Sequence, residues 1–144
     1  MIGNVDLDLL EKTYQNASTG ITAIEAVLNK AKDQQFSNDL HRQLRDYQEI
    51  ADKSKRQLRA NGAKAKDLSM YNKVMMKGNV KMNMLMNSSD SHIAQMVIRG
   101  STMGVTQMTK LLHAKKNADG ASAQIAEEFV HKEESNIEVM KNYL

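Results

Sequence analysis

The fold is decided by residues 6–31, which read DLDLLEKTYQNASTGITAIEAVLNKA. The apolar and small residues of this stretch recur in steps of three and four, at Leu10, Tyr14, Ala17, Ile21, Ile24, Leu28 and Ala31. On a helix with 3.6 residues per turn, this spacing makes one continuous stripe of the kind that a helical bundle buries. We therefore expect a long amphipathic helix over residues 6–31.

A second stripe of the same kind follows after a short break. Residues 37–60 are expected to turn one face inward, made of Leu40, Leu44, Tyr47, Ala51, Ser54 and Leu58. Asn61-Gly62 predicts the end of this helix, because these two residue types readily adopt the conformation that terminates helices. Only residues 34–36 separate the two stripes, so we expect the two helices to form an antiparallel hairpin.

The second half of the chain predicts another pair of helices. The first should begin within residues 88–91 and run to about residue 116, with an inward face of Ile93, Val97, Gly100, Gly104, Met108 and Leu111. Gly100 and Gly104 lie one turn apart and favour close packing against a neighbouring helix. The second should follow residues 117–121, with an inward face of Ile125, Ala126, Phe129, Val130, Ile137, Met140 and Leu144.

Composition supports the all-α class. The chain has 144 residues, no proline, seven glycines and 4% aromatic residues. This composition favours long helices over strands and hairpins, which need more frequent turn residues. We therefore predict that residues 1–144 form one domain, a four-helix bundle with a long connection between its second and third helices.

Several classes of protein are excluded or disfavoured by the same composition. The chain has no cysteine, which excludes disulfides, thiolate metal sites and a thiol nucleophile, and which is compatible with a reducing compartment. Residues 1–10 are acidic and lack the basic start and apolar run of a signal peptide. No stretch approaches the roughly 18 uninterrupted apolar residues of a spanning helix. We therefore expect a cytoplasmic protein.

A methionine-rich segment occupies part of the long connection. Seven of the eleven methionines fall between residues 75 and 103, and Asp90 is the only acidic residue between residues 68 and 118. We expect an additional helix over residues 68–86 that is apolar on two faces. Its outer face, formed by Met76, Val80 and Met84, predicts an interface, with a homodimer favoured and an unknown protein partner left open. Attachment to a membrane surface is disfavoured because this helix lacks tryptophan and phenylalanine.

Charge is unevenly distributed along the chain. Residues 53–81 hold nine basic residues and one acidic residue, whereas residues 119–144 hold six acidic and two basic residues. The basic stretch has no aromatic stacking platform and no motif that reads nucleic acid. We therefore interpret it as a solvated face or a complement to another subunit, and we expect no nucleic-acid partner.

Three short stretches carry a resemblance to a known family. They are SHIAQM at residues 91–96, GSTMG at residues 100–104 and EESNI at residues 133–137. Together with the bundle pattern, they resemble an uncharacterised family of small bacterial ferritin-like helical-bundle proteins, over most of the chain. The resemblance implies a ferritin-like bundle, whose long connection runs the length of the bundle. It implies no established activity.

A ferritin-like di-iron site would need about four inward carboxylates and two histidines, partly in Glu-x-x-His pairs. Glu128 and His131 have this spacing, but they point away from the apolar stripe of the last helix. Only Glu25 and Glu133 are predicted to point inward, so a complete site is not expected. A reduced iron or manganese site at these two residues is the alternative. Copper binding by methionine thioethers is disfavoured because neighbouring lysines would repel the cation.

Without a metal, a buried Glu133 would need hydrogen-bond partners or a proton. We therefore expect a buried polar cluster made of Glu25, Tyr47, Gln107, Glu133 and Asn136. A structural role for this cluster is favoured over a metal site or a catalytic acid, and no catalytic residue is predicted. The predicted function is self-association or contact with another protein, without a cofactor.

Overall fold

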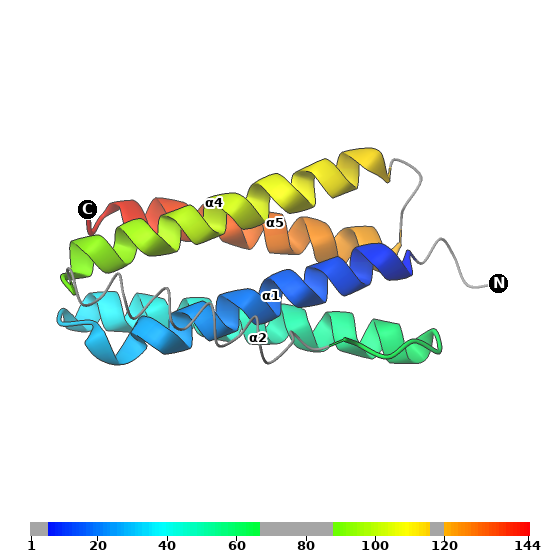
Figure 1. Ribbon diagram of the computed structural model, residues 1–144, viewed down its shortest axis with the longest axis horizontal. Coiled ribbons are helices and arrows are strands. Elements are labelled where there is room, and N and C mark those ends of the chain that lie inside the picture. The colour runs from blue at the N-terminus through cyan, green and yellow to red at the C-terminus, as the bar shows by residue number, and fades with distance from the viewer. Residues whose placement is uncertain (1–5, 67–87, 116–119) are drawn as a thin grey trace.

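The structure, a computed structural model, describes residues 6–66, 88–115 and 120–144 (Figure 1). Within these ranges the chain forms four α-helices, one short 3-10 helix and no strand. The elements are α1 (Leu7–Val27), η1 (Leu28–Lys30), α2 (Gln34–Ala60), α4 (Asp90–Ala114) and α5 (Ala121–Lys141). The prediction of an all-α four-helix bundle is confirmed.

Carboxylate or hydroxyl side chains cap the N-termini of α1, α2 and α4. The Asp6 carboxylate accepts a hydrogen bond from the Leu9 backbone N–H at 3.0 Å, and Asp33 accepts one from Phe36 at 2.9 Å. Such caps satisfy backbone donors that a helix leaves unpaired in its first turn. Because Asp33 is the cap, α2 begins at Gln34, three residues earlier than the apolar stripe indicates.

The helices pack as two antiparallel hairpins, α1 with α2 and α4 with α5 (Figure 1). The α1–α2 turn lies beside the start of α4, where the Asp90 carboxylate accepts hydrogen bonds from the backbone N–H groups of Lys32 and Asp33 at 2.8 and 2.9 Å. At the other end of the bundle, the Lys115 ammonium pairs with Asp6 at 3.3 Å. Helices α2 and α4 therefore run in the same direction, and the end of α2 and the start of α4 lie at opposite ends of the bundle (Figure 1).

The core follows the predicted stripes closely. Its largest fully buried side chains are Phe36, Phe129, Leu9, Leu10, Ile24, Leu40, Ile50, Leu58, Ile93, Met108, Met140 and Gln43. Two predicted inward positions are wrong. Leu144 is 62% exposed, because α5 ends at Lys141 and leaves this residue beyond the packed helix. Gly100 is exposed, and a Cβ at this position would meet nothing within 4 Å, so it makes no close helix contact.

The methionine-rich segment and its predicted interface residues, Met76, Val80 and Met84, lie outside the described residues. The additional helix and the homodimer therefore remain predictions. Among the helices of residues 6–66, 88–115 and 120–144, none combines the length and the apolar character that crossing a membrane requires.

Candidate functional site

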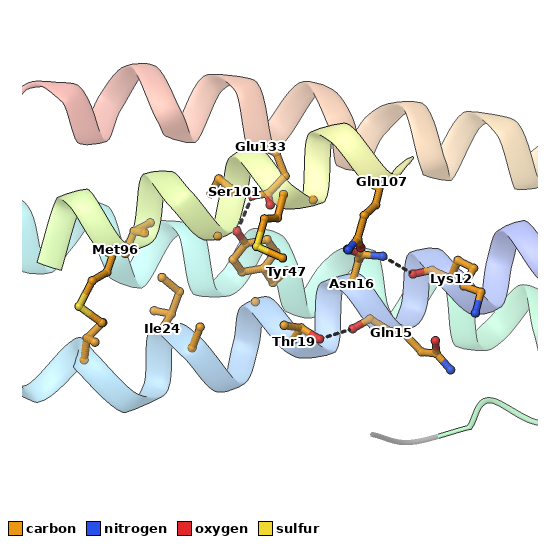
Figure 2. Close-up of a pocket in the computed structure, with 17 residues that line it drawn as sticks. Lys12, Gln15, Asn16, Thr19, Ile24, Tyr47, Met96, Ser101, Gln107 and Glu133 are labelled. Atoms are coloured by element: carbon orange, nitrogen blue, oxygen red, sulfur yellow. Dashed lines mark hydrogen bonds between the residues drawn. The ribbon is translucent and has the colours of Figure 1, made fainter. Parts of the chain in front are cut away.

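A cavity of about 430 Å³ lies between α1 and α4 (Figure 2). Its rim consists of exposed residues, including Met103, which is 61% exposed. Its floor consists of buried residues from all four helices. The lining residues are Lys12, Gln15, Asn16, Thr19, Gly20, Ala23, Ile24, Val27, Tyr47, Met96, Val97, Gly100, Ser101, Met103, Gly104, Gln107 and Glu133. This space is called the α1–α4 cleft below.

Glu133 of α5 is the acidic residue on the floor of the cleft, and it is only 3% exposed. Its Oε1 atom accepts hydrogen bonds from the Tyr47 hydroxyl of α2 and from the Ser101 hydroxyl of α4 at 3.2 Å. The Tyr47 oxygen in turn accepts a hydrogen bond from the Gln43 amide at 3.2 Å. Three helices therefore hold the carboxyl group in one orientation by a connected polar network.

Two glycines make room for this network. A Cβ on Gly104 would lie 2.8 Å from Glu133 Oε2 and 3.3 Å from the Phe129 ring. A Cβ on Gly20 of α1 would lie 2.6–2.8 Å from the Tyr47 ring. These distances are shorter than van der Waals contact. A larger residue at Gly104 would therefore displace the Glu133 carboxyl group, and a larger residue at Gly20 would displace the Tyr47 ring.

Burial changes the protonation chemistry of the acid. It raises the pKa of Glu133 from 4.5 to about 7, and the hydrogen bonds from Tyr47 and Ser101 only partly oppose this rise. Burial and the neighbouring Glu133 carboxylate also raise the pKa of Tyr47 well above its usual value of 10.0, so the phenol keeps its proton and donates a hydrogen bond to Glu133. Near neutral pH the carboxyl group therefore exists in both its charged and its protonated form.

The buried acid has no cationic partner among the described residues. On the outer seam between α2 and α5, Lys53 pairs with Glu128 at 3.0 Å, and Lys132 pairs with Glu49 at 3.2 Å and with Glu128 at 3.4 Å. These pairs engage both lysines of the seam with surface acids, and the carboxyl group on the cleft floor has no counterion among the described residues. A buried carboxylate without a counterion is costly, which explains why its proton is retained to higher pH.

The structure brings together three residues of the predicted polar cluster: Tyr47, Glu133 and Asn136. All three are buried, and Tyr47 is hydrogen-bonded to Glu133. Asn136 lies one turn beyond Glu133 on α5, and its Nδ2 atom is buried without a hydrogen-bond partner in the part of the chain that the structure describes.

The other two predicted members, Glu25 and Gln107, are exposed, so their assignment to a buried cluster is wrong. Near its C-terminal end, α1 buries Ile24 and Val27, whereas Ile21 is only partly buried. This phase turns Glu25 away from the core. Gln107 does line the cleft, but at the rim.

Sequence reasoning missed Ser101 and assigned Gly100 wrongly to a close helix contact. Ser101 is 2% exposed and reaches Glu133 from α4. The signal was present in the segment GSTMG at residues 100–104, in which every residue except Met103 is small. In an amphipathic helix, such a run indicates either close packing or space for another group, and sequence alone does not separate these outcomes. Here Gly104 serves the first purpose, and Gly100 borders open space.

The alternative prediction placed a reduced metal site at Glu25 and Glu133. Only Glu133 lies in the cleft, because Glu25 is exposed and does not line it. Within the described ranges, no three histidine or acidic side chains come together as metal ligands would. The geometry of the cleft floor is instead that of one acid held by neutral hydroxyl donors.

No protein-family model, no curated protein and no solved structure matches this chain. The interpretation of the cleft therefore depends on its own geometry and chemistry.

Proposed function

We propose that this chain is a ferritin-like helical bundle that acts as a binding protein, and that its α1–α4 cleft receives a small organic molecule. The observation that carries this proposal is the buried Glu133 carboxyl group at the floor of an otherwise largely apolar cavity of about 430 Å³. Small-molecule sites are typically concave, about 300–1,000 Å³ in volume, and furnished with a few convergent polar groups. Acids with a perturbed pKa inside such cavities are frequent markers of function.

The distribution of side chains along the cleft favours an elongated molecule with one apolar end. Ile24 and Met96 lie at one end of the cavity (Figure 2). Lys12 and Asn16 lie at the other end, and a further cavity of about 500 Å³ along the same two helices shares both residues. The molecule would therefore place its apolar part near Met96 and a polar group near Glu133.

Binding is favoured over catalysis because the described lining of the cleft lacks a complete catalytic set. The Tyr47 and Ser101 hydroxyls both donate to the same oxygen of Glu133, and the described lining residues include no histidine and no second acid to complete a set of nucleophile, base and orienting group. A rigid network of this kind orients a ligand and discriminates between polar groups. Self-association through Met76, Val80 and Met84 is a separate proposal that is compatible with a ligand in the cleft.

The test is to fill the cleft without disturbing its floor. Gly100→Leu would place a large side chain in the cleft, because a Cβ at Gly100 meets nothing within 4 Å. Thr102→Leu is the matched control, since Thr102 is exposed on the same helix and does not line the cleft. We expect 1-hexanol, a neutral probe, to bind the wild type and Thr102→Leu by titration calorimetry, and to bind Gly100→Leu at least about tenfold more weakly. Equal binding by all three proteins would refute the proposal.

A further inference from the structure

The uncompensated acid on the cleft floor restricts the chemistry of the molecule that the cleft would accept. Glu133 Oε1 receives the two hydroxyl hydrogen bonds from Tyr47 and Ser101. Glu133 Oε2 lies on the side of Gly104, where a Cβ would meet it at 2.8 Å. Glu133 and Gly104 both line the cleft, so the less engaged oxygen lies beside the bare glycine backbone in the cleft lining.

The charged groups around this oxygen do not supply a counterion. From α1, the one charged residue that lines the cleft is Lys12, and it forms no ion pair with Glu133. The lining residues from α4 are uncharged. From α2 and α5, the neighbours of Glu133 are the neutral Tyr47 phenol and the Asn136 amide. A ligand that carries its own positive charge would therefore satisfy a group that the protein leaves unpaired.

The surfaces beside the acid are also compatible with an organic cation. The Tyr47 ring lines the cleft, and aromatic faces attract ammonium groups. The thioether of Met96 and the aliphatic side chain of Ile24 offer apolar contact on one side. Lys12, on the opposite side, would repel a second positive charge.

We infer that the α1–α4 cleft binds an organic monoamine in its protonated form, with the ammonium group on Glu133 Oε2 and the apolar chain directed toward Met96. This inference depends on the proposed function, because it names the class of molecule that the same cleft receives. It distinguishes an amine from two other amphipathic molecules of the same length, a neutral alcohol and a carboxylate. A charge-assisted hydrogen bond to the carboxylate is stronger than a neutral one, which gives the amine at least about tenfold tighter binding than the alcohol.

The inference also fixes the sign of the pH dependence. The ammonium group pairs with the ionised form of Glu133, and the pKa of this carboxyl group is about 7. Between pH 6 and pH 8 the ionised fraction increases about tenfold, so the affinity for the amine should increase by about the same factor. Binding at pH 7 should release part of a proton from Glu133. A carboxylate ligand would need the protonated acid, and its affinity would decrease over the same range.

The experiment compares 1-hexylamine, 1-hexanol and hexanoate by titration calorimetry at pH 6 and pH 8, with the full chain and with Glu133→Gln. Repeating the amine titration in two buffers of different ionisation enthalpy measures proton release. We expect the wild type to prefer the amine at pH 8 by at least about tenfold, and Glu133→Gln, which is nearly isosteric, to lose both this preference and the proton release while still binding hexanol.

The other outcomes separate the inference from the proposed function. If hexanol and hexylamine bind the wild type equally well, or if hexanoate binds best, the inference is overturned and the cleft remains a binding site. If 1,6-diaminohexane binds as tightly as hexylamine, the apolar orientation of the chain is overturned. If none of the probes binds the wild type, the proposed function itself is overturned. Hexanol binding by Glu133→Gln also shows that this variant is folded.

Discussion

Replacing Gly104 by alanine is predicted to destabilise the bundle, whereas the same change at Gly100 is predicted to stabilise it. Both glycines lie inside α4 and line the same cleft. In a helix interior, glycine is about 1 kcal/mol less favourable than alanine, so propensity alone would favour both substitutions equally. The surroundings differ. At Gly104, the added methyl group would lie 2.8 Å from Glu133 Oε2 and 3.3 Å from Phe129. At Gly100, it would meet nothing within 4 Å.

The clash at Gly104 is not easily relieved, because the end of the Glu133 side chain is held by hydrogen bonds from Tyr47 and Ser101. Overpacking of this kind costs about 1–3 kcal/mol, so Gly104→Ala should be less stable than Gly100→Ala by about 2 kcal/mol. For a chain of this size, that difference corresponds to about 4–8 °C in Tm. Urea denaturation followed by circular dichroism at 222 nm measures it. Equal stability of the two variants would refute the close approach of Gly104 to the buried acid.

Three further predictions concern the buried acid and the end of the bundle. Burial raises the pKa of Glu133 from 4.5 to about 7, so between these pH values the folded chain holds a proton that the unfolded chain releases. The free energy of unfolding should therefore decrease by about 3 kcal/mol as the pH rises from about 4 to 8. Glu133→Gln should remove this dependence in urea denaturation at each pH, and an unchanged pH profile would contradict the assignment. Tyr47→Phe removes a hydrogen bond that favours the charged form, so carboxyl ¹³C NMR should show a higher pKa for Glu133, with a loss of about 1–3 kcal/mol in stability. Tyr143→Phe removes the hydrogen bond from the Tyr143 hydroxyl to the largely buried Asp39. This change should lower the free energy of unfolding by about 1–3 kcal/mol, measured by thermal denaturation. An unchanged stability would show that this contact is solvated.

The helices and most of their buried faces were predictable from the sequence because apolar spacing at three and four residues is a strong helical signal. Tyr47, Ala51 and Ser54 on α2 are buried as their spacing indicates. Helix boundaries were less predictable. A capping side chain such as Asp33 can start a helix several residues before its apolar stripe begins, through one hydrogen bond. The apolar stripe alone does not indicate this earlier start.

The site was only partly predictable because the edge of an apolar stripe does not define which side chains face a neighbour. Glu25 and Gln107 both lie at such edges, and a rotation of one residue, about 100°, separates an inward position from an exposed one. The role of Ser101 depends on how α4 lies against α5. The apolar pattern of a single helix also cannot predict the cleft, because the cleft depends on the distance between α1 and α4.

The central claim, that the α1–α4 cleft binds a small organic molecule, is tested most directly by NMR of protein labelled with ¹³C at its methionine methyl groups. Met96 and Met103 line the cleft, whereas Met140 is buried on α5 and does not line it. On titration with 1-hexylamine at pH 8, we predict saturable shifts of the Met96 and Met103 signals, no shift of Met140, and loss of these shifts in Gly100→Leu. Shifts that do not saturate, or that affect Met140 equally, would contradict the account.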